Sequence, residues 1–174
     1  MLTDISDVVF CENRERTEQI PVGLTSFDSR LGTFPILNRP VAEFTFENRE
    51  NRKLLIHCVA DVRVAVPCGR CLTEVPTDIH LVSDRELSLE EGTVREEEME
   101  DISYLSGWNL DADRLIYGEL LMNWPAKVLC KQDCRGICRV CGQNLNEGDC
   151  GCEKTERDPR MAAIQDIFNK FKEV

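Results

Sequence analysis

The sequence predicts an α+β fold built on an antiparallel β-sheet or partial barrel with a long hairpin. Apolar and polar residues alternate over 41–46 and again over 56–66, and a period of two is typical of strands with one buried face. Pro67 ends the second alternation, and a turn with two cysteines, 68–71, leads into another extended run over 75–82. The pattern therefore indicates an antiparallel hairpin that carries a cysteine pair at or near its tip.

A helix is predicted in the middle of the chain. Asn109 or Asp111 is suited to cap its N-terminus, and the helix runs to about Asn123 because Pro125 disfavours helical backbone in the residue before it. Four apolar side chains of this helix are expected to face inward: Leu115, Ile116, Leu120 and Met122. A cysteine-dense segment without clear periodicity follows over 130–152.

A second helix is predicted at the end of the chain. Asp158 is a suitable N-cap, and Pro159 suits the first helical position. Four apolar residues then follow at helical spacing: Ile164, Ile167, Phe168 and Phe171. This stripe is expected to pack against the domain, with a groove on a partner as the alternative. The chain is thereby divided into a strand-rich domain with one helix, a cysteine-rich zinc module and a C-terminal helix: 1–126, 127–157 and 158–174.

The net charge of −11 is unevenly distributed. Between 84 and 101, nine acidic residues and two arginines give −7, and this stretch is expected to be a solvated acidic loop. From 127 to 174, nine Lys or Arg and eight acidic residues give +1. The acidic surface disfavours nucleic-acid binding by the whole protein but leaves room for a local contact through the C-terminal part.

The composition indicates a globular protein of a reducing compartment. With 174 residues, of which 42% are hydrophobic, the chain can form a core without disulfides. Residues 1–7 resemble no signal peptide, and no apolar run approaches the roughly 18 residues that a membrane span needs. We therefore expect a cytoplasmic protein without a membrane partner, in which clustered cysteines bind metal or do redox work.

Eight of the ten cysteines form four closely spaced pairs: Cys68 and Cys71, Cys130 and Cys134, Cys138 and Cys141, Cys150 and Cys152. Structural zinc takes four ligands in a tetrahedron, and a short knuckle presents two sulfurs to one ion. The last two pairs are joined by a short, turn-rich loop, 143–149, which could do little more than fold the chain back onto a metal. They are the stronger candidate for a four-cysteine zinc site.

The remaining two pairs are numerically suited to a second four-cysteine site, in which zinc would join the hairpin tip to the segment after the first helix. A rival interpretation is a single C-terminal site that draws on Cys130 or Cys134 and leaves Cys68 and Cys71 free. Another rival is a thiol–disulfide motif at Cys68 and Cys71. Redox pairs of that type lie at a helix N-terminus, whereas this pair follows a predicted strand and precedes no helical pattern.

The other candidate residues carry less chemistry. Cys58 lies on the apolar face of the long strand and is expected to be a buried small hydrophobe. Cys11 has no evident partner, and His57 is expected to face solvent. No serine–acid or cysteine–base arrangement points to nucleophilic catalysis, so neither a catalytic residue nor a small-molecule substrate is expected and the protein is not expected to be an enzyme.

The cysteine pattern resembles the YceD family, the large ribosomal RNA subunit accumulation proteins, over roughly 55–172. The similarity is carried by three motifs in order: Cys68-x-Arg70-Cys71-Leu72, Leu129-Cys130-x3-Cys134-x-Gly136-x-Cys138-x2-Cys141-Gly142-x-Asn144-Leu145-Asn146, and Cys150-x-Cys152 followed by Asp158-Pro159-Arg160. The resemblance implies a mixed α/β fold built on the cysteine hairpin and a non-enzymatic cytoplasmic role in accumulation of large-subunit ribosomal RNA.

Resemblance and cysteine spacing together suggest a ribosome-assembly factor with one or two zinc ions. Its expected partner is a ribosomal RNA precursor or a large-subunit ribosomal protein, contacted through four basic residues between the ligands: Lys127, Lys131, Arg135 and Arg139. The acidic stretch suits a basic ribosomal protein better than RNA. The alternatives are a thiol–disulfide redox protein that uses Cys68 and Cys71, and a zinc-stapled adaptor unrelated to ribosomes.

Overall fold

The computed structural model describes residues 2–50, 52–90, 93–94 and 102–152. Its centre is a five-stranded sheet in which all neighbouring strands are antiparallel, in the order β2-β5-β6-β7-β8. The strands are β2 (Glu15–Pro21), β5 (Val41–Arg49), β6 (Lys53–Pro67), β7 (Glu74–Glu90) and β8 (Thr93–Val94). Within the described residues the order does not close on itself. The α+β prediction is confirmed, as an open sheet and not a barrel.

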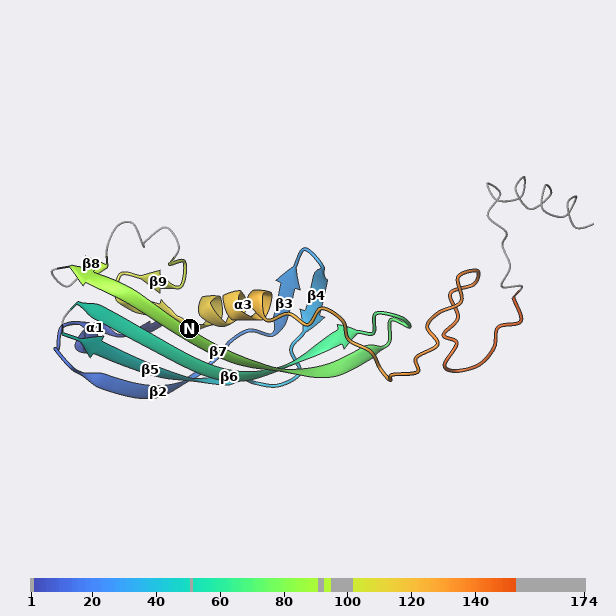
Figure 1. The fold of residues 1–174 in the computed structure, drawn as a ribbon, viewed down its shortest axis with the longest axis horizontal. Helices are drawn as coiled ribbons and strands as arrows, with labels where there is room; N and C mark the ends of the chain where they lie inside the picture. The colour runs from blue at the N-terminus through green and yellow to red at the C-terminus, as the bar shows by residue number, and fades with distance from the viewer. Residues whose placement is uncertain (1, 51, 91–92, 95–101, 153–174) are drawn as a thin grey trace, which may run out of the picture.

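The predicted hairpin is formed by β6 and β7. Their register runs without interruption from Lys53 opposite Ser88 to Pro67 opposite Glu74, which places the cysteine turn at the tip. Figure 1 shows the hairpin extending beyond the other strands, with its tip next to the chain that leaves α3 (Ala112–Met122). The long alternation of the sequence thus positions a two-cysteine turn away from the main core.

The expected acidic loop from residue 84 is wrong for 84–90, because β7 continues to Glu90. Asp84 and Glu86 lie on the exposed face of the strand, while Leu87 and Leu89 are buried on the other face. A strand with one solvated face accepts charges at alternate positions. The high density of charge therefore obscured the alternation of buried and exposed residues that is typical of a strand. Residues 91–92 and 95–101 of the expected loop lie outside the described residues.

The N-terminal part, for which no elements were predicted, supplies small elements. They are β1 (Leu2–Asp4), α1 (Ser6–Val9), β3 (Ser26–Ser29) and β4 (Gly32–Pro35). β1 joins β9 (Leu105–Ser106) and β10 (Asn109–Asp111) in a three-stranded sheet of order β1-β10-β9, and β3 pairs with β4. Figure 1 shows the β3–β4 hairpin and α3 over the same face of the large sheet. They cover the apolar face that the long strands present.

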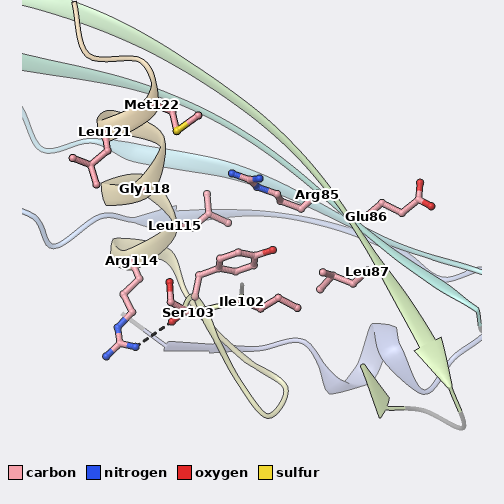
Figure 2. Close-up of a pocket in the computed structure, with 11 residues that line it drawn as sticks. Arg85, Glu86, Leu87, Ile102, Ser103, Arg114, Leu115, Gly118, Leu121 and Met122 are labelled. Carbon is pink, nitrogen blue, oxygen red and sulfur yellow. Dashed lines mark hydrogen bonds between the residues drawn. The ribbon is translucent and has the colours of Figure 1, made fainter. Parts of the chain in front are cut away.

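The mid-chain helix α3 confirms its predicted boundaries. The side chain of Asp111 accepts a hydrogen bond from the backbone N–H of Arg114 at 3.4 Å, as an N-cap does. Three of the four expected apolar residues are buried: Leu115, Ile116 and Leu120. The expectation is wrong for Met122, the last residue of the helix, which is 81% exposed and lines an open hollow of about 520 Å³ (Figure 2).

The inward face of α3 also carries a charge. Glu119 is buried and accepts hydrogen bonds from Ser83 Oγ at 2.7 Å and from the Arg85 guanidinium at 2.5 Å. Because a buried carboxylate is stable only when it is paired, these two residues of β7 tie the helix to the sheet. No described helix is long and apolar enough to cross a membrane.

An aromatic cluster fixes the chain where it leaves α3. The Trp124 ring lies with its centroid 4.7 Å from those of both Phe27 and Phe34, which belong to the β3–β4 hairpin. Aromatic pairs at this separation contribute about 0.5–1.5 kcal/mol beyond their burial. Val128 also packs against the core. The segment after the helix is thereby directed along the sheet toward the tip of the β6–β7 hairpin (Figure 1).

Candidate metal centres

The turn at the hairpin tip forms the first cysteine knuckle. The Cys68 backbone N–H donates to the Thr73 carbonyl at 2.8 Å, and the Leu72 N–H donates to the Cys68 carbonyl at 3.0 Å. Leu72, directly after Cys71, has a φ of 63°, in the left-handed region that L residues other than glycine rarely adopt. The tight turn presents both cysteine side chains to the same point.

The segment after α3 delivers the next pair to that point. The Gly69 backbone N–H donates to the Val128 carbonyl at 2.9 Å, and the Arg70 guanidinium donates to the Cys134 carbonyl at 3.0 Å. These contacts join residues about 60 positions apart in the sequence, so that Cys130 lies beside the knuckle. The core side of the cluster is closed by Val75 and Leu129, which pack against the cysteines.

The four sulfurs of this first cluster have the geometry of a metal site. Cys68, Cys71, Cys130 and Cys134 place their Sγ atoms within 4.8 Å of one another. Two separations are 3.8 Å, between Cys68 and Cys134, and 3.5 Å, between Cys71 and Cys130. A tetrahedron with Zn–S bonds of about 2.3 Å has S···S edges of about 3.8 Å, whereas a disulfide needs about 2.05 Å. The arrangement fits a metal ion coordinated by four cysteine thiolates.

The second cluster repeats this construction with Cys138, Cys141, Cys150 and Cys152, whose Sγ atoms also lie within 4.8 Å of one another. The Gly142 N–H donates to the Cys138 carbonyl at 2.9 Å, and Gly142 has a φ of 76°. Gly142 follows its knuckle as Leu72 follows the first. The Val140 N–H lies 3.4 Å from Cys138 Sγ, which directs a backbone donor at a sulfur.

Hydrogen bonds make some thiols of the first cluster more acidic than others. The pKa of Cys68 is lowered to about 6, chiefly by the backbone N–H of Cys71. The pKa of Cys71 is lowered by the Thr73 side chain. The pKa of Cys130 is raised to about 12, first through its hydrogen bond with the Cys71 side chain. The cluster favours thiolates but retains a proton that an incoming cation can displace.

The second cluster shows the same division between its thiols. The backbone N–H of Cys141 lowers the pKa of Cys138 to about 6. The pKa of Cys152 is raised to about 12, first by its hydrogen bond with the Cys141 side chain. Each cluster therefore has one acidic thiol in its leading knuckle, Cys68 or Cys138. Thiolate is the form that binds metal. Within the described residues, these two clusters are the only groups of metal-ligating side chains that converge.

The donor set indicates which ion fits and what it can do. Four cysteine sulfurs in a tetrahedron are typical of structural zinc, which leaves no position open for a substrate or an activated water. The two pairings 68/71 with 130/134 and 138/141 with 150/152 are those that the spacing suggested, and the rival single site built on Cys130 or Cys134 does not match this geometry. Such sites can staple a chain but have no means to activate a substrate.

The remaining candidates lie apart from the clusters. His57 is exposed, as expected, and its Nδ1 lies 2.6 Å from Asp84 Oδ1 across the hairpin. Cys58 is 1% exposed in the core, where burial raises the pKa of its thiol to about 12. Cys11 is exposed, with Arg14 Nη1 4.0 Å from its sulfur. The C-terminal helix predicted from Asp158 onward lies outside the described residues.

Two asparagines of the family-like motif, Asn144 and Asn146, contact the first cluster although the sequence predicts no chemical role for them. Asn146 Nδ2 donates to Cys134 Sγ at 3.3 Å, and Asn144 Nδ2 lies 3.4 Å from Thr73 Oγ1. Their loop belongs to the second cluster, yet both contacts reach the first. Cysteine spacing predicts neither of these two asparagine contacts. Of the four basic residues expected to contact a partner, Arg135 donates a hydrogen bond to the Asp149 carboxylate at 2.5 Å.

A comparison with protein families gives one match. The family model described as large ribosomal RNA subunit accumulation protein YceD matches residues 56–168, more than half of the chain. The match begins within β6 and includes all eight clustered cysteines. No curated protein and no solved structure matches the chain.

Proposed function

Because the chain belongs to the YceD family of large ribosomal RNA subunit accumulation proteins, we propose that it is a non-enzymatic, zinc-binding factor in the accumulation of large-subunit ribosomal RNA. It acts in the cytoplasm, with two zinc ions that shape the surface presented to a ribosomal partner. The observation that supports the zinc part most directly is the convergence of eight cysteines into two groups of four sulfurs.

Both zinc ions have a structural role in this proposal. The first would join the hairpin tip to the segment after α3, where Gly69 and Val128 already share a backbone hydrogen bond. The second would close the loop that follows Cys141. When bound, zinc supplies four strong bonds to sulfur and so replaces a hydrophobic core that the module lacks. The lack of an open coordination position supports a non-enzymatic role.

The charge of the protein favours a basic partner. Zinc with four thiolates carries a net charge of −2, which offsets the basic residues of the module, and the whole chain carries −11 before any thiolate is counted. Phosphate backbones are repelled by such a surface, whereas basic ribosomal proteins are attracted to it. We therefore propose a large-subunit ribosomal protein as the direct partner, with precursor RNA as the other candidate.

The test is genetic complementation with sedimentation. Deletion of the gene in its natural host should lower the ratio of large- to small-subunit ribosomal RNA, and the tagged wild-type protein should restore it and co-sediment with precursor large-subunit particles at moderate salt. Cys68→Ser/Cys71→Ser should fail to restore the ratio. Cys11→Ser, at an exposed cysteine outside both clusters, is the matched control. An unchanged ratio after deletion, with no co-sedimentation, contradicts the proposal.

The redox alternative draws on one observation, the pKa of about 6 at Cys68, since acidic thiols are also the reactive ones. The pair nevertheless lies between two strands, β6 and β7, and not at a helix N-terminus. Thiol titration of metal-loaded protein separates the two functions. Ligands of zinc should stay protected until a chelator is added, whereas a redox pair should react at once.

A further inference from the structure

We propose that the two cysteine clusters bind zinc cooperatively, because the loop of the second cluster places Asn146 as a positioning residue against a sulfur of the first. This inference rests on the zinc binding proposed above but concerns how the two sites depend on each other. Asn146 lies between Cys141 and Cys150 in sequence, yet its side chain contacts Cys134. A residue delivered by one site thus becomes part of the other.

Both ends of the Asn146 amide form hydrogen bonds at the first cluster, one with Cys134 and one with the residue that follows it. Its Nδ2 donates to Cys134 Sγ at 3.3 Å, and its Oδ1 accepts the backbone N–H of Arg135 at 2.9 Å. Because the oxygen is held by a donor, the NH₂ group must point at the sulfur. Donors aimed at an anionic ligand stabilise the charged form and orient it. Asn146 therefore holds Cys134 in the geometry that a metal needs.

Asn144 extends the contact to the first knuckle. Its Oδ1 accepts both the backbone N–H of Asn146 at 3.0 Å and the side-chain amide of Asn146 at 2.8 Å. Its Nδ2 reaches Thr73 Oγ1 at 3.4 Å, and that hydroxyl lies 3.3 Å from Cys71 Sγ. The loop of the second cluster is thereby connected with a ligand candidate from each pair of the first.

The loop is positioned by the backbone on which the second cluster is built. The Leu145 N–H donates to the Gly136 carbonyl at 2.9 Å, and Ile137 forms a β-bridge with Asn144. Gly136 has a φ of 77°, and a Cβ at this position would approach the Arg70 carbonyl oxygen to 3.1 Å. The backbone at Gly136, between the two clusters, thus lies against the backbone of the first knuckle at Arg70, where no side chain fits without displacement of its neighbours.

These contacts couple the two binding events through the order of the loop. An ion at the second cluster fixes both ends of the loop, so that Asn146 is already in place when the first cluster binds its ion. Without that ion, ordering the loop costs conformational entropy. Coupling between two binding equilibria is reciprocal, so an ion at the first cluster must strengthen binding at the second by the same factor.

The experiment titrates metal-free full-length protein with zinc and counts ions per chain by native mass spectrometry. Cooperative binding keeps the population of singly loaded protein below that of two independent sites at half saturation. Asn146→Ala should raise the singly loaded population and weaken the first cluster by about 10-fold or more, the usual effect of removing a partner of a metal ligand. The affinity is measured by competition with a chromophoric chelator.

The control is Gln143→Ala, which removes an exposed amide side chain from the same loop. Among the described residues the Gln143 side chain makes no hydrogen bond with either cluster, so this variant should load as the wild type does. Reciprocity is tested with Cys150→Ser/Cys152→Ser, which should weaken the first cluster, and with Cys68→Ser/Cys71→Ser, which should weaken the second by the same factor.

Each outcome has a distinct meaning. Two zinc ions that bind with a statistical distribution, and an Asn146→Ala variant that loads as the wild type does, overturn the cooperativity and leave the zinc sites intact. A wild-type protein that binds no zinc overturns the proposed function itself. If Asn146→Ala fails to fold, the paired cysteine variants decide, because equal loss of affinity at the opposite site supports coupling and unchanged affinity refutes it.

Discussion

The sheet and the cysteine module hold their chains together by different means. In the sheet, whole apolar side chains such as Phe44, Phe46 and Leu54 are fully buried. Between 127 and 152, the described residues include no helix or strand, and only Cys134, Gly136 and Cys138 are buried. One region folds through hydrophobic burial, and the other has too little apolar surface to do so. From this difference we expect the module, unlike the sheet, to depend on a bound metal ion for its structure.

The largest expected effect follows from removal of the metal. Chelation should abolish the amide protection of the module, including Gly142 and Leu145, because metal binding is folding energy for a unit without a core, on the order of 10 kcal/mol in zinc-finger peptides. Strands β5 and β6 should keep their protection. Hydrogen exchange followed by mass spectrometry measures both regions in one sample. Uniform loss of protection across the chain would contradict the division between the two regions.

The converse change is a substitution in the core of the sheet, which should leave the cysteine module unaffected. Phe44→Ala removes a ring that is 0% exposed and should lower the free energy of unfolding of the sheet by about 3–5 kcal/mol, without a change in zinc per folded chain. Denaturant titration followed by circular dichroism checks the first value, and elemental analysis checks the second. Leu31→Ala, at a side chain that is 74% exposed, should stay within about 0.5 kcal/mol of the wild type.

Acidity should weaken the module and spare the sheet. Each cluster holds a thiol with a pKa of about 12, Cys130 or Cys152, whose proton zinc must displace at pH 7. Each also holds a thiol with a pKa of about 6, Cys68 or Cys138, which is mainly thiolate at pH 7 and protonated below 6. Affinity should therefore fall about tenfold per pH unit for each displaced proton, and more steeply below pH 6.

Competition titrations from pH 8 to pH 5.5 measure this dependence. Zinc affinity should decrease as the pH is lowered, because protons compete with zinc for the thiolates. Both clusters should therefore lose zinc as the solution becomes more acidic. Zinc affinities that do not change over this range would show that the thiols are not the ligands.

The smallest expected effect separates the two knuckles. Leu72 and Gly142 hold equivalent positions with φ values of 63° and 76°, but only the glycine adopts this conformation without strain. Leu72→Gly should relieve strain and tighten the first site, and Gly142→Ala should strain the second, each by about 1 kcal/mol or about fivefold in zinc affinity. A Cβ at position 142 would meet no atom within 4 Å, so backbone strain is the only change there.

Chelator competition on the two variants checks the opposite signs. If both substitutions weaken binding equally, contacts of the Leu72 side chain outweigh its backbone strain, and the two knuckles are not equivalent.

Much of the fold and of the candidate site could be predicted from the sequence because both follow from short-range rules. A period of two gave the β6–β7 hairpin, and paired cysteines gave both groups of four sulfurs. The strand over 84–90 was missed because its charges lie on a solvated face. The short strands before residue 40 carry no long alternation, and their pairing depends on distant partners such as β10.

The role of Asn146 could not be predicted for a related reason. Its contact with Cys134 connects the two clusters, whereas cysteine spacing indicates only which residues belong to each cluster. An asparagine in a turn-rich loop is also usually explained by the turn alone. The contact depends on how the two knuckles meet at Gly136 and Arg70, which is a property of the folded chain.

The most direct test of the division between core and metal is the metal content of the purified chain. Elemental analysis combined with native mass spectrometry should find two zinc ions per chain, one for each group of four sulfurs. A folded, monodisperse protein purified under reducing conditions that holds no zinc, and that takes up none on titration, would contradict it.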